Sequence, residues 1–424
     1  MNVYTFLILS FIIFVYLVET AADILNIKNL SKNIPSEFDG YYDKEKYAKS
    51  QEYLKTITKF SIVSSALFLT VQIIFILSGG FNYVNIKAVS FGFGPILTGL
   101  IFAGILFFAI EILRIPFSAY DVFIIEEKFG FNKMSVKTFI ADLLKSWIIN
   151  VVIGAVLFAA VLWLFTNVHK YAWMYAFIAI AAFELFITFI APVTIMPLFN
   201  KYTPLEDGEL KNSVEIYAKK ENFKMKGIFK MDESKRSTKP NAFLAGFGKF
   251  RRIVLFDTLI DKYTVDELTS VLAHEMGHFK RGHVLKSTIF SFVLTLITLF
   301  AFSLFINKKW LYEAFLMNTQ PIYAGIILFP FLCKPVSLII SVISSYFSRK
   351  NEYEADAYAI KTYKKPQDMI NALKKLSVDS LSNLYPHKLK VFLEYSHPPI
   401  LERIEAIKKI SFYQEKFHGS GNNT

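Results

Sequence analysis

Seven long apolar segments constrain the fold of this 424-residue chain more than any other feature of its sequence. A helix that crosses a bilayer needs roughly 20 mostly apolar residues, and only helices or closed barrels satisfy their backbone polar groups inside lipid. The first segment lacks the basic residues that begin a signal peptide, so we interpret it as a retained helix. The segments are residues 3–18, 58–79, 93–117, 146–167, 171–195, 285–306 and 322–347. The sequence therefore predicts a mainly α, polytopic membrane protein.

The composition agrees with a membrane protein. Hydrophobic residues make up 54% of the chain and charged residues 19%, whereas soluble proteins average about 25% charged residues. The net charge of +12 is compatible with nucleic-acid binding, but lysines collected in cytoplasmic loops explain it better. Membrane lipid, and not nucleic acid, is therefore the predicted partner. The one cysteine, Cys333, excludes an intrachain disulfide and any cysteine-based metal cluster.

Lysine-rich and lysine-poor connections alternate between the seven segments, and the positive-inside rule assigns the lysine-rich ones to the cytoplasm. The lysine-rich connections are 19–57, 118–145, 198–284 and the region after Ser348, whereas few basic residues lie near Lys87, Lys170 and Lys308. The rule therefore predicts that the N-terminus lies outside the cytoplasm. It places the C-terminus and the long segment 198–284 inside the cytoplasm.

Several charged residues lie within the apolar segments. Charge at membrane depth usually faces a protein interior or a water-filled space, so Glu111 and Glu184 favour a polar interior. Arg114 is close enough to the cytoplasmic end to be either an interface anchor or a cavity residue. Paired prolines break the end of the fifth segment and interrupt the seventh, which is tolerated where helices pack or line a cavity.

The chain outside the membrane has the pattern of a small α+β unit. The predicted elements are a helix at 205–222, strands at 227–231 and 252–256, a helix at 264–283, and a pair of amphipathic helices within 364–410. Thr264 is the expected N-cap of the helix at 264–283. The predicted divisions are membrane helices with their loops at 1–200, a cytoplasmic segment at 201–284, two membrane helices at 285–347, a cytoplasmic helical segment at 348–412 and a disordered tail at 413–424.

Residues 274–278 read His-Glu-Met-Gly-His and lie in the predicted helix 264–283. Two histidines four residues apart share one face of a helix, so His274 and His278 can bind one zinc ion. The glutamate that follows the first histidine is then placed to accept a proton from a zinc-bound water. The motif predicts one zinc ion per chain, two of its ligands, and Glu275 as the general base of a hydrolase.

A catalytic zinc ion needs a third protein ligand, and the acidic segment after the seventh span offers one. Glu352 and Asp356 share a helical face, so we predict that Glu352 binds zinc and that Asp356 accepts the second ring N–H of a ligand histidine. Glu354 is the alternative ligand, but it lies on a different face from Asp356. Two spans separate His278 from Glu352, which returns the chain to the same side of the membrane. An acidic start to a cytoplasmic helix would explain these residues without a metal.

Three further residues have both functional and structural interpretations. His397 is a candidate donor to the oxyanion formed during hydrolysis, although a lone histidine is more often a surface or core residue. Asn241 precedes the strand at 252–256 and either supplies a strand edge and an amide for an extended substrate or is only a polar hairpin residue. His283 follows the zinc motif by five residues, so we expect it to point away from the zinc and lie at the membrane interface.

Together these features resemble the type I CAAX prenyl proteases, a family of integral-membrane zinc endopeptidases. The resemblance covers nearly the whole chain and implies seven helices that form an α-barrel around a water-filled intramembrane chamber. A small zincin-like peptidase domain of class α+β is expected on the cytoplasmic side. Besides the zinc motif, the segments that carry the resemblance are Arg114–Tyr120, Ile125–Asn132, Pro197–Leu205, Ser234–Ser237, Asn241–Phe243, Arg252–Leu259, Ser348–Arg349 and Tyr395–Arg403.

The resemblance also implies roles for individual residues. His274, His278 and Glu352 are expected to bind zinc, with Glu275 as the base. Asn241 and His397 are expected to contact the substrate or to stabilise the tetrahedral intermediate. In eukaryotic members the substrate is a prenylated C-terminal CaaX peptide, so a peptide or protein substrate that carries a lipid is expected here.

One departure from the eukaryotic pattern affects the expected location. Eukaryotic members often carry a long acidic insertion where this chain has only the short linker from Ile260 to Asp266. A bacterial inner-membrane member is therefore expected, or a protein of the endoplasmic reticulum if the source is eukaryotic. The alternatives are a quality-control protease without prenyl substrates, a zinc-dependent lipid hydrolase, and a transporter-like seven-helix protein with a structural metal. The oligomeric state does not follow from the sequence.

Overall fold

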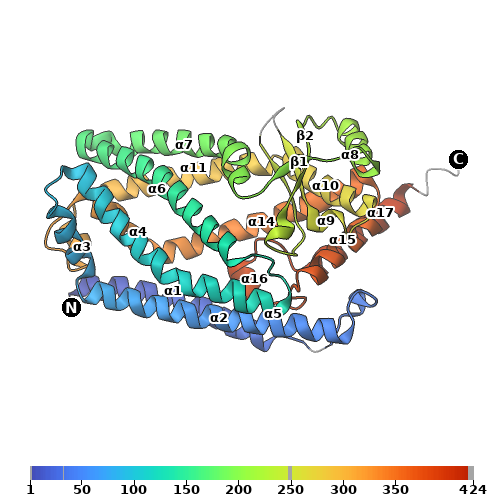
Figure 1. The fold of residues 1–424 in the computed structure, drawn as a ribbon, viewed down its shortest axis with the longest axis horizontal. Coiled ribbons are helices and arrows are strands. Elements are labelled where there is room, and N and C mark those ends of the chain that lie inside the picture. The colour runs from blue at the N-terminus through green and yellow to red at the C-terminus, as the bar shows by residue number, and fades with distance from the viewer. Residues whose placement is uncertain (1, 32, 247–250, 419–424) are drawn as a thin grey trace.

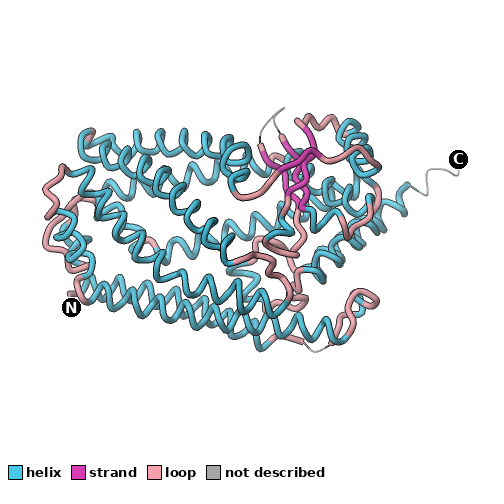
Figure 2. Tube along the Cα trace, in the orientation of Figure 1, coloured by secondary structure: helices cyan, strands magenta, loops and turns pink. Residues whose placement is uncertain are grey.

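The computed structural model describes residues 2–31, 33–246 and 251–418. Long helices run side by side along the longest axis of the molecule, and a small sheet lies with several shorter helices towards one end (Figure 1). Helices make up most of the chain, and the strands are confined to that one region (Figure 2). The N-terminus lies at the end opposite the sheet (Figure 1). The mainly α fold predicted from the sequence is confirmed.

Six single helices and one bent pair are long and apolar enough to cross a membrane. The single helices are α1 (Val3–Lys28), α2 (Lys44–Leu77), α4 (Pro95–Tyr120), α6 (Val136–Asn167), α7 (Ala172–Ile190) and α11 (His283–Phe305). The bent pair consists of α13 (Ile322–Leu332) and α14 (Lys334–Tyr363), which meet at 59°. Each of the seven predicted segments falls on one of these elements. Several helices extend beyond the apolar stretch into the polar parts of the chain.

The breaks in the membrane helices coincide with prolines, as expected. Pro330 and Pro335 flank the bend between α13 and α14. Each proline removes a backbone donor and crowds the preceding turn, which favours a break in the helix. After α7, Pro192 lies in a π-helical turn (Ala191–Ile195) and is followed by a 3-10 turn (Met196–Leu198). A second π-helical segment (Asp121–Glu126) follows α4.

Neighbouring membrane helices close a ring. Helix α1 packs against α2, α4 against α6, α6 against α7, and α7 against α11. Helix α2 reaches α4 through α3 (Gly80–Val89) and the π-helical segment after α4. Helix α13 contacts both α11 and α14, and α14 returns to α1. The order agrees with the α-barrel that the resemblance implies.

Helix α11 has two exposed faces of different chemistry. Leu285, Ile289 and Val293 form an exposed apolar stripe that suits contact with lipid. The opposite face carries the hydroxyl residues Ser287 and Ser291, and Thr295 and Thr298 continue this stripe. Because the hydroxyl face is turned away from the lipid-facing stripe, it gives the ring of helices a polar inner surface.

A four-stranded mixed sheet forms the centre of the unit outside the membrane helices. Its strands are β1 (Tyr202–Pro204), β2 (Gly227–Met231), β3 (Ala242–Ala245) and β4 (Arg252–Phe256). Their order is β1-β2-β4-β3, so β3 is an edge strand. Strands β2 and β4 are parallel, and the other two pairs are antiparallel. The two predicted strands are β2 and β4, and the edge expected near Asn241 is β3.

Helix α10 (Val265–Lys280), which carries the His-Glu-Met-Gly-His motif, is held by a buried core beside the sheet. Thr264 and Glu267 form a capping box at its start, which satisfies two backbone donors and fixes where the helix begins. Leu268, Leu272 and Met276 are at most 1% exposed and pack with residues of β4. The core also includes residues of α8 (Glu209–Lys220) and α9 (Asp257–Ile260).

The C-terminal region forms three helices and not the predicted pair. They are α15 (Pro366–Asp379), α16 (Lys388–Glu394) and α17 (Ile400–His418). Pro386 precedes α16, and Pro398 and Pro399 precede α17. These prolines therefore divide into three helices a region that the amphipathic pattern predicted as two. Helix α17 includes the first residues of the predicted tail, and residues 419–424 lie outside the described part of the chain. The remaining short helices are α5 (Glu127–Phe129) and α12 (Lys309–Glu313).

Candidate metal centre

Three side chains from two helices converge on one point. The Nε2 atoms of His274 and His278, both on α10, are 3.1 Å apart. Glu352 of α14 approaches them from the other side, with Oε1 3.3 Å from His278 Nε2 and Oε2 3.5 Å from His274 Nε2. One ligand atom from each residue lies within 4.8 Å of the other two. The sequence predicted these three residues as the metal ligands, and the structure brings them together.

Gly277 allows the two helices to approach closely enough for this convergence. A Cβ atom at this position would lie 3.1 Å from the backbone of Ala355 and 3.2 Å from Cβ of Tyr358, both on α14. Such distances are tighter than ordinary van der Waals contact, so a larger residue would push α14 away from α10. The glycine inside the histidine motif therefore determines the distance between Glu352 and the two histidines.

The arrangement of donors fits a bound cation. Glu352 Oε2 is buried and has no hydrogen-bond partner among the described residues. The two Nε2 atoms face each other, while each Nδ1 atom lies within hydrogen-bond distance of another side chain. If both Nδ1 atoms carry the ring protons, two nitrogen lone pairs and a carboxylate point at the same space. A cation at that point would satisfy all three groups.

Asp356 and Arg403 support the first histidine. Asp356 Oδ1 is 2.8 Å from His274 Nδ1, as the sequence predicted. Arg403 of α17 donates two hydrogen bonds to Asp356, at 2.9 and 2.7 Å, and its Nη1 lies 3.3 Å from Glu352. Asp356 is 1% exposed and Arg403 is 8% exposed. Sequence reasoning missed Arg403, whose only signal was its place in the segment Tyr395–Arg403.

His283 and Glu354 support the second histidine, and the expectation that His283 points away was wrong. His283 Nδ1 is 3.0 Å from His278 Nδ1, and His283 Nε2 is 3.2 Å from Glu354 Oε2. The expectation assumed one continuous helix. Instead α10 ends at Lys280, and Gly282 adopts a left-handed conformation with φ +69° that redirects the chain into α11. Glu354, the alternative metal ligand, faces His283.

Glu275 lies beside the converging ligands and lines a cavity of about 470 Å³. Burial raises the pKa of its carboxyl group more than the neighbouring histidines lower it. His278 and His283 also line this cavity, together with Leu244 of the edge strand β3. A larger surface cavity of about 680 Å³ beside α2 contains none of the predicted site residues.

The two residues expected to contact the substrate lie at different distances from the centre. His397 Nε2 is 3.5 Å from Glu352 Oε1, and its side chain is 65% exposed. Asn241 is exposed immediately before β3, and its Oδ1 accepts a hydrogen bond of 2.8 Å from the backbone of Ala242. The backbone carbonyl of Asn241 also accepts a hydrogen bond from Phe256 of β4. The amide nitrogen of its side chain makes no hydrogen bond to described residues and is left to face solvent.

Comparisons with known proteins agree over most of the chain. Residues 23–201 match the model of the CAAX prenyl protease N-terminal domain of five membrane helices, and residues 204–411 match that of peptidase family M48. The chain is 35% identical to a probable CAAX prenyl protease 1 of Schizosaccharomyces pombe, over 89% of this chain and 82% of the relative. It is 34% identical to a homologue from Arabidopsis thaliana, over 94% and 96%.

A solved structure is similar over nearly the full length. The crystal structure of Ste24p from S. mikatae superimposes with a TM-score of 0.91 at 33% sequence identity. The match covers 96% of this chain and 99% of that one. It includes both the membrane helices and the unit that carries the histidine motif.

Proposed function

Because the chain belongs to peptidase family M48 and is an integral, multi-pass membrane metalloprotease, we propose that it binds one zinc ion through His274, His278 and Glu352. The observation that supports this most directly is the convergence of the three side chains, in which a buried oxygen of Glu352 accepts no hydrogen bond from described residues. Two histidines and a glutamate form a common ligand set of catalytic zinc in peptidases. When bound, zinc supplies a Lewis acid that polarises the scissile carbonyl and acidifies the attacking water.

Glu275 is proposed as the general base. It accepts the proton of the attacking water and later donates it to the leaving amine, so the carboxylate is regenerated in each cycle. Its raised pKa makes the carboxylate more basic than an exposed glutamate, which favours the first of these transfers. Its place on the wall of the cavity leaves it accessible to a substrate.

His397 and the edge strand β3 are proposed to hold the substrate. The exposed His397 imidazole is close to Glu352 and is available to donate to the developing oxyanion. An extended peptide can pair with the free edge of β3, whose residue Leu244 reaches the catalytic cavity. The free amide nitrogen of Asn241, at the start of β3, is then a donor to the peptide backbone.

The proposed substrate is a prenylated protein with a C-terminal CaaX sequence, from which the tripeptide is removed. The matched relatives are named CAAX prenyl proteases. The test is cleavage of a farnesylated CaaX peptide by the purified protein in detergent, with the unprenylated peptide as control. We expect cleavage that a zinc chelator stops and that added zinc restores. Equal cleavage of both peptides would contradict the prenyl specificity, and cleavage that resists the chelator would contradict the metal mechanism.

We further propose that the histidine motif faces the cytoplasm and the N-terminus the opposite side, because the lysine-rich connections lie on the motif side. The short linker from Ile260 to Asp266 supports a bacterial inner membrane as the location. With Cys333 replaced by serine, Glu215→Cys is expected to resist an impermeant thiol reagent in intact cells and to react after permeabilisation. Labelling in intact cells would reverse the proposed orientation.

His283 and Glu354 are proposed to position His278 for metal binding. With a metal bound at His278 Nε2, the ring proton would lie on Nδ1 and would be donated to His283 Nδ1, 3.0 Å away. His283 then donates its Nε2–H to Glu354. Such outer partners typically contribute 10–100-fold to metal affinity. We therefore expect His283→Phe to weaken zinc affinity by about 10–100-fold, measured by competition with a chromophoric chelator.

The same variant separates positioning from folding. The thermal unfolding midpoint of the metal-free protein should change much less than the metal affinity, and Glu354→Gln should have a smaller effect because its amide oxygen still accepts the N–H. If His283→Phe leaves the zinc affinity unchanged, His283 has only a packing role.

Metal affinity is expected to depend on pH through His274. Burial alone would lower the pKa of the imidazole, but the hydrogen bond and charge of Asp356, together with a hydrogen bond to Glu352, outweigh burial and raise it to about 9. Below that pH the metal-free ring holds a proton that the metal must displace, so affinity should increase by roughly tenfold per pH unit from about pH 7 and level off near pH 9. Asp356→Asn should move the plateau to lower pH. A zinc affinity that stays constant between about pH 7 and about pH 9 would show that binding does not displace a proton from His274.

A further inference from the structure

The catalytic cavity extends beyond the metal ligands into the ring of membrane helices. Its wall near the metal centre is formed by Glu275 and His278 of α10 and Leu244 of β3. Phe279 of α10 and residues of α7, α11 and α14 form the rest of its lining. A substrate bound along β3 would therefore have a side chain close to the scissile bond within reach of the membrane helices. The inference below rests on the proposed peptidase function.

The part of the cavity formed by membrane helices carries several polar side chains and one acidic side chain beside the apolar Val284. Ser287, Ser348 and Asn351 line it, and Glu184 of α7 supplies a carboxylate. The hydroxyl of Ser291 donates a hydrogen bond of 3.3 Å to Glu184 Oε1. The other carboxylate oxygen of Glu184 accepts no hydrogen bond from the described residues.

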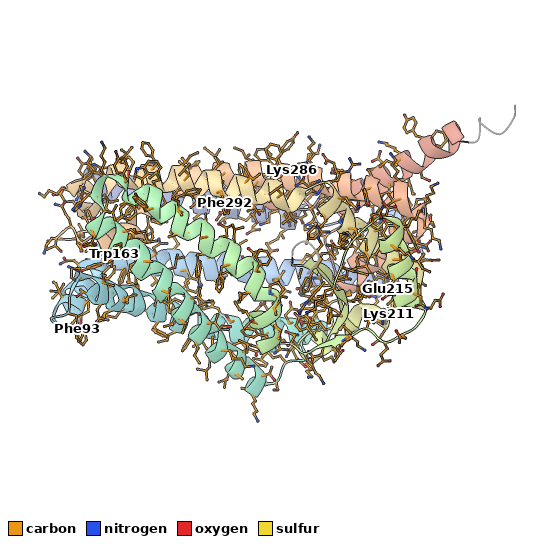
Figure 3. The ribbon with its side chains drawn as sticks, turned by 90° about the horizontal axis from the view of Figure 1, so that it is seen from above. Phe93, Trp163, Lys211, Glu215, Lys286 and Phe292 are labelled. Carbon is orange, nitrogen blue, oxygen red and sulfur yellow. The ribbon has the colours of Figure 1, made fainter. Side chains whose placement is uncertain are left out.

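No basic residue of the protein neutralises Glu184 in the described part of the chain. Neither lysine nor arginine lines the cavity, and Glu184 is absent from every ion pair formed by described residues. The lysine of α11, Lys286 (Figure 3), is exposed and its charge acts on His283 and Glu354, but it does not line the cavity. Glu111, a carboxylate of the membrane helix α4, differs in this respect because it pairs with Arg114.

A carboxylate without an ion pair, in a cavity that Glu275 also lines, has a clear binding preference. An aliphatic side chain would displace water from Glu184 without replacing its hydrogen bonds, which is unfavourable. A cationic side chain would supply both the charge and the donors, in a site where the surrounding protein weakens solvent screening. We propose that this region of the cavity is a specificity subsite in which Glu184 binds the side chain of a substrate lysine or arginine near the scissile bond.

The subsite can be tested with a peptide that the enzyme cleaves in the assay above. Lysine or norleucine, which has a similar length and no charge, is placed in turn at each of several positions on both sides of the scissile bond. We expect one position at which lysine raises kcat/KM roughly tenfold over norleucine in the wild-type enzyme. Glu184→Gln should bring that ratio close to one while cleavage of the norleucine peptide is retained.

Glu111→Gln is the matched control. Glu111 is also a carboxylate of a membrane helix, but it accepts a hydrogen bond of 3.0 Å from Trp147 and does not line the cavity. It should keep the lysine preference of the wild type. Cleavage without any lysine preference, or a preference that survives Glu184→Gln, would overturn the subsite alone. If the wild-type enzyme cleaves no peptide at all, the proposed function fails, and the subsite fails with it.

Discussion

Replacing Glu275 with glutamine is expected to lower kcat by roughly 10³-fold while the protein stays folded and keeps its metal. The amide has nearly the shape of the carboxylate but cannot accept a proton from the attacking water. His274, His278 and Glu352 are unchanged, so metal binding should be preserved. The measurement is single-turnover cleavage of the prenylated peptide, with zinc content and thermal unfolding followed on the same preparations.

The control for this variant is Glu215→Gln, which changes an exposed glutamate of α8 (Figure 3) that does not line the catalytic cavity. It should retain the activity of the wild type. Cleavage by Glu275→Gln within about tenfold of the wild type would show that another group accepts the proton. The proposed mechanism would then be wrong even if the metal site is correct.

Replacing Arg403 with leucine is expected to destabilise the protein by about 3–5 kcal/mol, because it leaves a buried carboxylate without its cationic partner. Asp356 is 1% exposed and receives two hydrogen bonds from Arg403, and Glu352 lies 3.3 Å from the same guanidinium. The two carboxylates would then repel each other across the metal centre. Thermal unfolding of the metal-free protein in detergent measures the loss.

Two further variants show whether the loss of stability comes from the buried cluster. Arg403→Lys keeps the charge but not the paired geometry, so it should lose less stability than Arg403→Leu. Lys409→Leu, which removes an exposed ion pair from the same helix, should leave the unfolding temperature unchanged. An Arg403→Leu protein as stable as the wild type would show that the buried cluster does not depend on the arginine.

The elements that sequence reasoning predicted well are those with strong local signals. The thickness of the bilayer sets the length of the apolar stretch in a spanning helix, so apolar stretches of that length identify the spans. The start of α10 at Thr264 was predictable because a capping box is a local pattern of two residues. The return of Glu352 towards His278 followed from the even number of spans between them, and the structure brings the two residues together.

The features that sequence reasoning missed depend on contacts between distant segments. Arg403 lies 47 residues from Asp356 in the sequence, and no local pattern indicates that the two side chains meet. His283 was misplaced because the predicted helix 264–283 included it, whereas α10 ends at Lys280 and the left-handed Gly282 turns the chain into α11. The close approach of α10 and α14 depends on Gly277, whose role is visible only when its neighbour Ala355 is in place.

The central claim is that His274, His278 and Glu352 hold the catalytic zinc ion. A crystal structure of the purified protein, with anomalous scattering recorded at the zinc absorption edge, tests it most directly. The account predicts a single peak about 2.0–2.2 Å from the Nε2 atoms of both histidines and from a carboxylate oxygen of Glu352. A peak bound by Glu354 in place of Glu352, or one away from α10, would contradict it.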